Sequence, residues 1–282
     1  MKWVTFKSKL AKENQNQRDQ RVGWVDLEKS LVHEVGVASV LEMIQRGIVE
    51  TSTVATHALS EVELLAPIPR PTSMRDAYAF RQHVETARRN RGVDMIPEFD
   101  QFPVFYFTNH QSVTGPGSVL VQELHLNQLD FELEVAIVIG KECRNLKATE
   151  ADDCIWGYTV MNDWSARGLQ MEEMKLNLGP AKGKDFATST GPWLVTRDEL
   201  LKNGQLRATP RGEVLYADMK AFVNGKQYSE GNVSQMHWTF AEILERASYG
   251  VTLYPGDVIG SVTVGTGCFL ELNGSKITDN LW

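Results

Sequence analysis

The sequence predicts an α+β protein in which β structure predominates, with a small N-terminal α+β domain and a larger rolled or sandwich-like β domain. Three observations support this. Alternating apolar runs outnumber helical ones, Gly and Pro occur densely between them, and a proline-rich connector at 67–71 separates the N-terminal segment from the rest of the chain. Many strands with few helices favour such a β domain over a doubly wound α/β sheet. We place the domains at 1–68 and 69–282.

The N-terminal domain is expected to open with strands at 3–6 and 22–27, separated by a polar, exposed loop at 7–20. Apolar residues at helical spacing predict a helix over 37–46, with Gly47 as its C-cap. A short strand at 62–66 follows. The connector 67–71 then has three prolines in five residues, which makes an extended, semi-rigid segment.

The larger domain is expected to open with a helix over 76–90 and to continue mainly as strands. Glycine and proline pairs between the apolar runs indicate the turns. The predicted strands lie at 119–126, 131–139, 156–161, 193–195, 219–223 and 269–272.

Composition excludes several classes of function. A net charge of −7 argues against nucleic acid as the main partner, because phosphate binding needs a basic surface. No stretch approaches the 18 apolar residues of a membrane span, and the N-terminus lacks a signal-peptide core, so we expect a cytoplasmic protein. The three cysteines, odd in number and without metal-finger spacing, predict buried free thiols and a reducing compartment.

The most informative run is the one from Asp130 to Gly140. In a strand, Glu132 and Glu134 emerge on one face while Phe131, Leu133 and Val135 emerge on the other. Two like charges two residues apart resist burial, and a shared cation would remove that cost. Alone, the run is better explained by an ordinary half-exposed strand that has a solvated acidic face.

Two further segments add polar side chains that could bind a substrate or take part in catalysis. The apolar run at 156–161 ends in Asn162 and Asp163, followed by Arg167 and Gln170, which can hold substrate oxygens. Taken separately, this is also what a strand-end Asp with a surface Arg looks like. Upstream, Asp76 and His83 are seven residues apart, which on a helix is two turns and one face. His83 by itself is typical of an ordinary helix histidine.

Together these segments resemble the fumarylacetoacetate hydrolase family from about Pro67 to the end of the chain. The run from Arg81 to His83, with Asp76 seven residues before the histidine, strengthens the resemblance. Departures occur at Gly168, where an Asp often stands, and at Gly92, where an Arg is expected and Arg91 is adjacent. The matching motifs are Glu132-Leu133-Glu134, Asn162-Asp163-Trp164-Ser165-Ala166-Arg167, Gly183-Lys184-Asp185-Phe186 and Gly256-Asp257-Val258-Ile259-Gly260-Ser261-Val262-Thr263.

The resemblance implies a mixed β-roll catalytic domain, a homodimer and a metal-dependent active site. An all-carboxylate ligand set favours a hard cation, Mg²⁺ or Ca²⁺, with Mn²⁺ as a further option. The implied metal ligands are Asp76, Glu132, Glu134 and Asp163. The implied catalytic residues are His83 as base, Glu271 as its orienting partner, and Lys184, Arg167 and Gln170 as holders of substrate oxygens. Tyr78, Tyr106 and Thr263 are the implied substrate contacts, although core packing explains each tyrosine equally well.

The implied activity is hydrolysis of a carbon–carbon bond in a small β-diketo acid, with fumarylacetoacetate, cleaved to fumarate and acetoacetate, as the leading candidate. An acylpyruvase or an oxaloacetate decarboxylase is the alternative among enzymes, and decarboxylation would not need His83 to activate water. A catalytically silent metal-binding relative is the third possibility. The presence of His83, Lys184 and Glu271 argues against the silent relative, which has no need of a base and its orienting group.

Overall fold

The computed structural model describes residues 1–9, 20–49, 51–278 and 281–282, so most of the loop expected at 7–20 lies outside the described residues. The strands are β1 (Lys2–Ser8), β2 (Arg21–Asp26), β3 (Leu31–Val35), β4 (Thr53–Ala58), β5 (Val62–Leu64), β6 (Met74–Ala77), β7 (Phe105–Phe107), β8 (Val113–Thr114), β9 (Leu129–Asp130), β10 (Leu133–Ile139), β11 (Cys143–Arg144), β12 (Ile155–Asp163), β13 (Ser165–Ala166), β14 (Thr188–Thr190), β15 (Leu194–Thr196), β16 (Leu206–Thr209), β17 (Gly212–Leu215), β18 (Asp218–Val223), β19 (Lys226–Asn232), β20 (Thr252–Leu253) and β21 (Val258–Gly260). The α-helices are α1 (Val40–Gln45), α2 (Arg81–Asn90), α3 (Ala148–Ala151), α4 (Arg167–Met174), α5 (Arg197–Lys202), α6 (Phe240–Ala247) and α7 (Phe269–Gly274).

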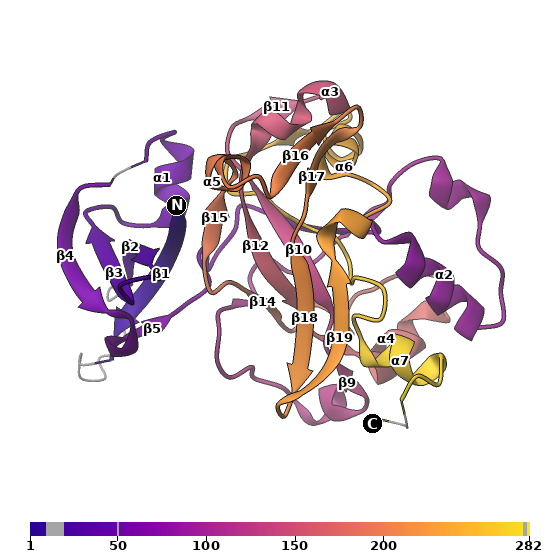
Figure 1. Cartoon of the computed structure of the whole chain (residues 1–282). Coiled ribbons are helices and arrows are strands. Elements are labelled where there is room, and N and C mark those ends of the chain that lie inside the picture. Colours follow the sequence, from indigo (N-terminus) through magenta and orange to yellow (C-terminus); the bar gives the residue numbers. More distant parts are fainter. Residues whose placement is uncertain (10–19, 50, 279–280) are drawn as a thin grey trace.

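One mixed sheet connects most of these strands in the order β4-β3-β2-β1-β15-β12-β10-β21-β6-β7, with β5, β14 and β8 branching from it. Most pairs are antiparallel, whereas β21 with β6 and β14 with β8 are parallel. Figure 1 shows β1–β5 and α1 as a lobe that meets the rest of the molecule where β1 pairs with β15. The predicted α+β class with predominant β structure is confirmed. The sheet is continuous across this junction, and the division after residue 68 stays a prediction.

The strand β10 separates the two principal parts of the core. Its odd-numbered residues, such as Ile137 and Ile139, pack into a cluster that includes residues of α6. Its even-numbered residues Ala136 and Val138 pack on the other side with Trp3 and the N-terminal lobe. This alternation is the period-two pattern predicted from the sequence. All seven residues of β10 are buried, so Glu134 places a carboxyl group inside the protein, and a solvated acidic face is excluded.

Three of the predicted elements are wrong. Asp76 lies in strand β6, held between β21 and β7, and the helix begins only at Arg81, so the two-turn spacing argument fails. Residues 119–126 form no strand but end in a short 3₁₀ helix, η4 (Glu123–Leu126), and Leu120 is 89% exposed. Residues 269–272 belong to helix α7. The first N–H groups of α7 are accepted by Asp130, a residue about 140 positions away that no local pattern reveals.

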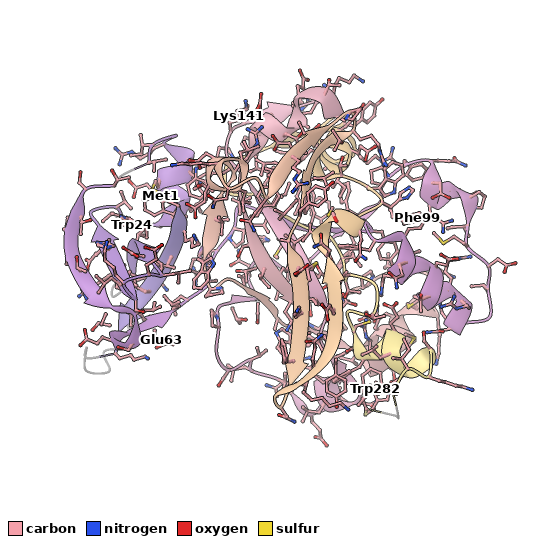
Figure 2. The ribbon with its side chains drawn as sticks, viewed as in Figure 1. Met1, Trp24, Glu63, Phe99, Lys141 and Trp282 are labelled. Atoms are coloured by element: carbon pink, nitrogen blue, oxygen red, sulfur yellow. The ribbon has the colours of Figure 1, made fainter. Side chains whose placement is uncertain are left out.

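The three cysteines are free and buried, as predicted. Among the described residues, the helices are too short or too polar to cross a lipid bilayer. Figure 2 shows side chains filling the space between the ribbons, with Trp24 and Glu63 on the N-terminal lobe and Phe99 on the side away from it.

Candidate active site

Four buried carboxylates from three different parts of the main sheet converge on one point. Asp76 comes from β6, Glu134 from β10, Glu132 from the residue before β10, and Asp163 from the end of β12. Each offers an oxygen atom, and these four oxygens lie within 4.8 Å of one another. The four residues are at most 4% exposed. The strand alternation predicted for Glu132 and Glu134 therefore brings them to the same site as Asp76 and Asp163.

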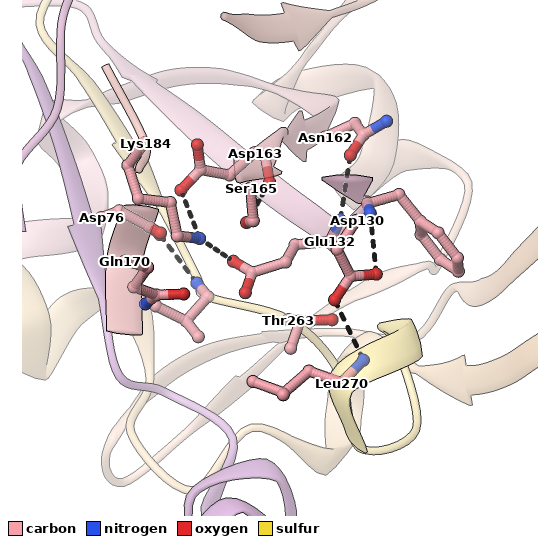
Figure 3. A network of polar contacts seen from close by, with 12 residues as sticks. Asp76, Asp130, Glu132, Asn162, Asp163, Ser165, Gln170, Lys184, Thr263 and Leu270 are labelled. Carbon is pink, nitrogen blue, oxygen red and sulfur yellow. Dashed lines mark hydrogen bonds and ion pairs between the residues drawn. The ribbon is translucent and has the colours of Figure 1, made fainter. Parts of the chain in front are cut away.

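Two cations lie against this cluster and neutralise only part of its charge. Lys184 Nζ donates to Glu132 Oε2 at 2.6 Å and to Asp163 Oδ2 at 3.0 Å (Figure 3). Arg167 Nη2 donates to Glu132 Oε1 at 2.8 Å. Burial lowers the pKa of Lys184, but the charges of Asp163 and Glu132 outweigh burial and raise it above its ordinary value. Lys184 is therefore a cation at neutral pH.

Of the remaining carboxylate oxygens in the cluster, only Asp76 Oδ1 has a donor among the described residues, the Val262 N–H at 2.8 Å. Within the described residues, Asp76 Oδ2, both oxygens of Glu134 and Asp163 Oδ1 are buried without a hydrogen-bond donor. Burial, reinforced by the charge of Asp163, raises the pKa of Asp76 to about 7. Burial, reinforced by the charge of Asp76, raises the pKa of Glu134 well above its usual range. Burial would also raise the pKa of Glu132, but Lys184 and Arg167 instead lower it to about 2.

This arrangement fits a hard divalent cation. Unpaired buried carboxylates are costly, and a cation that accepts their lone pairs removes the cost. The donor set consists of oxygens alone, which suits Mg²⁺ or Ca²⁺. Gly260 leaves the necessary space, because a Cβ there would lie 2.6 Å from Asp76 Oδ1 and 3.0 Å from Glu134 Oε2.

A histidine–carboxylate pair lies between helices α2 and α7. His83 Nδ1 and Glu271 Oε2 are 2.9 Å apart, and both side chains are buried. In the tautomer that carries its proton on Nδ1, His83 donates a hydrogen bond to this carboxylate. The lone pair of Nε2 is then free to accept a proton. Although Glu271 was expected on a strand, its position in the first turn of α7 still brings it to His83, so the predicted pairing is present in the structure.

A cavity of about 530 Å³ joins the carboxylates to this pair. Asp76, Glu132 and Lys184 line it, as do His83 and Glu271. The acidic cluster, a cation and a candidate base therefore line a single space. Its further lining comes from α2, α4, the strand β7 and the loop before Lys184.

Arg167 and Gln170 enter this cavity from the first turn of helix α4. Arg167 is 2% exposed, and its Nε donates to Asp130 Oδ2 at 2.8 Å. Its Nη1 donates to Gln170 Oε1 at 2.9 Å. Because the carbonyl oxygen of Gln170 is engaged in this way, its amide N–H groups are the ones left for a ligand.

Glu173, one turn further along α4, holds the loop that delivers Lys184. Its carboxylate accepts the backbone N–H groups of Ala181 at 3.0 Å, Lys182 at 2.6 Å and Gly183 at 3.3 Å. Gly183 packs closely on Gln170, since a Cβ there would lie 2.8 Å from the Gln170 Cβ. The loop and the helix therefore fix Lys184 relative to Arg167.

The three expected substrate contacts differ in their positions. Tyr78 and Tyr106 both line the cavity, and the Tyr106 hydroxyl donates to Asp163 Oδ2. Thr263 is fully buried and does not line the cavity. Its hydroxyl donates instead to the carbonyl oxygens of Leu133 and Val264. In this structure Thr263 therefore contacts backbone carbonyl groups, and its role as a substrate contact stays a prediction.

Sequence reasoning missed the residues that position the site. Asp130 continues the alternation of Glu132 and Glu134 and is buried at 1% exposure, so the same period-two argument could have identified it. Asn162 accepts the Glu132 N–H at 2.9 Å, which explains why an amide precedes Asp163. No sequence signal identified Glu173, because its partners are the backbone N–H groups of a loop.

The comparison with known families agrees with this geometry. Residues 72–278 match the family described as fumarylacetoacetate (FAA) hydrolase C-terminal. An oxaloacetate tautomerase of Bacillus subtilis is 31% identical over 73% of this chain and 64% of its own length. A maleylpyruvate hydrolase of Aquipseudomonas alcaligenes is 30% identical over 73% of this chain and 67% of its own. The chain thus spans less than two thirds of the Bacillus relative.

Among solved structures, a fumarylacetoacetate hydrolase from the psychrophile Exiguobacterium antarcticum superposes with a TM-score of 0.69. It is 28% identical, and the alignment covers 95% of this chain and 88% of that one. Its fold is that of the mixed β-roll expected from the resemblance. The sequence match and the structural likeness together show that this chain belongs to the fumarylacetoacetate hydrolase family of enzymes.

Proposed function

We propose that this enzyme is a divalent-cation-dependent hydrolase that cleaves a carbon–carbon bond in a small β-diketo acid, for which fumarylacetoacetate is the reference substrate. The observation that carries the proposal is the His83–Glu271 pair, which shares one cavity with the carboxylate cluster and Lys184. Hydrolysis needs a base for water in addition to a site for negative charge, and this cavity offers both.

Asp76, Glu132, Glu134 and Asp163 would hold the cation, Mg²⁺ or Ca²⁺, with Mn²⁺ also compatible. When bound, it supplies Lewis-acid stabilisation of negative charge on the substrate's oxygens. The unpaired oxygens of Asp76, Glu134 and Asp163 support this assignment.

His83 acts as the general base in the proposed reaction. Its Nε2 takes a proton from water while the water oxygen bonds to the carbonyl carbon beside the scissile bond. The carbon–carbon bond then breaks, and its electron pair stays with the departing fragment. His83 returns the proton to that fragment, which leaves as a ketone, while the other product leaves as a carboxylic acid. Glu271 keeps the imidazole in the tautomer that this sequence of steps requires.

The cationic and amide groups orient the substrate. Lys184 and Arg167 stay positively charged beside the cluster, and Lys184 lines the cavity. Lys184 and the Gln170 amide are placed to donate to the oxygens on which charge develops. Tyr78 and Tyr106 contact the same space from β6's continuation and β7.

Oxaloacetate chemistry is the second candidate, because the Bacillus relative is named an oxaloacetate tautomerase. Tautomerisation moves a proton between carbon and oxygen, and decarboxylation releases carbon dioxide. Neither needs an activated water. The products therefore distinguish the two candidates: hydrolysis incorporates one oxygen atom from water into a new carboxylate.

The test is a turnover screen with purified protein over fumarylacetoacetate, acetylpyruvate and oxaloacetate, with and without excess EDTA. We expect hydrolysis of a β-diketo acid that EDTA abolishes and Mg²⁺ restores. His83→Ala should lower kcat by about 10²–10⁴, the usual contribution of a general base, with little change in KM.

The matched control is His57→Ala, which removes a histidine in the N-terminal lobe and should leave turnover unchanged. An unchanged rate in excess EDTA would contradict the cation assignment. Near-full hydrolysis by His83→Ala would show that another group activates water. Turnover of oxaloacetate alone, without solvent oxygen in the products, would favour the second candidate.

A further inference from the structure

The cavity changes character along helix α4. Arg167 and Gln170 face it in the first turn of the helix, followed by Met171 and then Met174 at the last turn. At 1.5 Å per residue, Met174 lies about 10 Å along the helix axis from Arg167. The lining along α4 thus passes from charged to apolar with increasing distance from the carboxylate cluster.

Other elements continue the apolar lining around this end. Val104 just before β7, Phe105 at its start, Pro180 from the loop before Lys184, and Leu270 from α7 all line the cavity. Val104 is 48% exposed and Met174 is 38% exposed, although both are apolar. Apolar side chains that line an open cavity gain free energy when a ligand covers them. Methionine side chains are flexible and adapt to varied hydrocarbon shapes.

Charge at this end of the cavity is sparse. Among the described lining residues, Arg91 is the one side chain that carries a charge at neutral pH outside the group formed by the carboxylates, Lys184, Arg167, His83 and Glu271. It is exposed, and its Nε donates to the Ala87 carbonyl oxygen at 3.1 Å. This hydrogen bond ties the guanidinium to the last turn of its own helix. Lys184 and Arg167, for their part, are already paired with carboxylates.

We propose that the substrate is a β-diketo acid whose acyl group is an extended hydrocarbon chain, bound along Met171 and Met174. This inference rests on the proposed function, which places the oxygen-rich acid end at Lys184 and the carboxylate cluster. A cavity of about 530 Å³ is in the range that encloses drug-sized ligands, so it exceeds the needs of a four-carbon acid. Long-chain acylpyruvates should therefore be better substrates than acetylpyruvate or than fumarylacetoacetate, which carries a terminal carboxylate.

Binding can be measured separately from turnover with simple 2-oxo acids in the presence of Mg²⁺. Calorimetry with pyruvate, 2-oxobutanoate, 2-oxohexanoate and 2-oxooctanoate should give a Kd that falls by about three- to fourfold for each added methylene group, until the chain leaves the cavity. Met174→Ser should flatten this dependence and leave the Kd of pyruvate unchanged. Leu176→Ser is the matched control, because Leu176 is 80% exposed and does not line the cavity.

Several results would overturn the inference. These are a Kd independent of chain length, no binding of any of the acids, the same slope in Met174→Ser, or tighter binding of a 2-oxo diacid than of a monoacid of equal length. The last result would instead assign the distal end to Arg91. Chain-length-dependent binding without any hydrolysis of acylpyruvates would support the inference while contradicting the proposed function. Hydrolysis of acylpyruvates together with a Kd that does not depend on chain length would support the proposed function and contradict the inference.

Discussion

Asp130 and Glu134 lie four residues apart on one buried acidic run, and their surroundings are opposite. Asp130 accepts hydrogen bonds from the N–H groups of Phe131, Phe269 and Leu270. It also forms an ion pair with Arg167, so both of its oxygens are saturated. Glu134 is as deeply buried, yet neither of its oxygens has a hydrogen-bond donor among the described residues.

The difference separates two uses of a buried carboxylate. A saturated carboxylate fixes structure: Asp130 ties the start of α7, and with it Glu271, to the guanidinium of Arg167. An unsaturated one is costly unless a ligand completes it, and such costs are typical of functional sites. Both residues are buried carboxylates, at the end of β9 and within β10, and only one of them is saturated. The comparison therefore predicts that substituting them has different consequences.

The largest effect is expected at Glu134. Glu134→Gln removes a charge that would bind the cation, and it should abolish turnover. In excess EDTA its melting temperature should be no lower than that of the unsubstituted protein, because no hydrogen bond or ion pair is lost. At a hundredfold excess of Mg²⁺ over Kd, the unsubstituted protein should gain about 5 °C and the variant should gain nothing. Differential scanning calorimetry with and without Mg²⁺ measures both quantities.

Glu142→Gln is the control for this experiment, because it makes the same chemical change at an exposed position. It should keep the full Mg²⁺-dependent rise in melting temperature. An equal rise in Glu134→Gln would mean that Glu134 holds no cation and that its isolation has another cause.

A smaller but still large effect is expected at Asp130, and on stability instead of cation binding. Asp130→Asn turns an amide toward N–H groups and removes one of the two carboxylates that Arg167 contacts at 2.8 Å. Breaking a buried ion pair costs about 3–5 kcal/mol, which urea denaturation would detect. The Mg²⁺-dependent rise in melting temperature should survive, since Asp130 is not among the four clustered carboxylates. If Asp130→Asn instead lost the Mg²⁺-dependent rise and kept its stability, Asp130 would be a cation ligand and not a structural carboxylate.

The same comparison explains which parts of the fold and of the site could be predicted from the sequence alone. Alternation in β10 is a local property, so the shared face of Glu132 and Glu134 could be predicted. The position of Asp76 could be predicted only through the family resemblance, because its strand is defined by pairing with β21 and β7. The helix at 269–274 depends on Asp130 for its first N–H groups, and contacts so distant in the chain leave no local pattern.

Surface properties were the least predictable. The apolar residues at 120–126 alternate as in a strand, yet Leu120, Leu124 and Leu126 are exposed, because no neighbouring strand pairs with them. The apolar side of the cavity was not foreseen either, since Met171 and Met174 belong to a helix whose cavity-facing side is set by tertiary packing. The homodimer and the cytoplasmic location stay predictions.

The smallest effect tests the comparison outside the site, at a carboxylate that is only half saturated. Asp152 Oδ2 accepts the Glu213 N–H at 2.8 Å, whereas Oδ1 is buried without a partner among the described residues. Burial raises the pKa of Asp152 to about 6. The folded state therefore holds its proton more tightly than the unfolded state, so ionisation destabilises the fold. This penalty is fully present above pH 6 and disappears as pH falls toward 4.

Asp152→Asn keeps an acceptor for Glu213 and cannot ionise, so it should stabilise the fold at pH 7 by about 1 kcal/mol, less than the full shift implies because the new amide lacks an acceptor. The gain should vanish near pH 4, where the native aspartate is also neutral. Urea denaturation of both proteins across this pH range measures it. Asp153→Asn, at a neighbouring carboxylate that is 67% exposed and ion-paired with Arg197, should show no such pH-dependent gain. A constant difference between Asp152→Asn and the unsubstituted protein at every pH would show that packing, and not an unsaturated charge, sets the cost at this position.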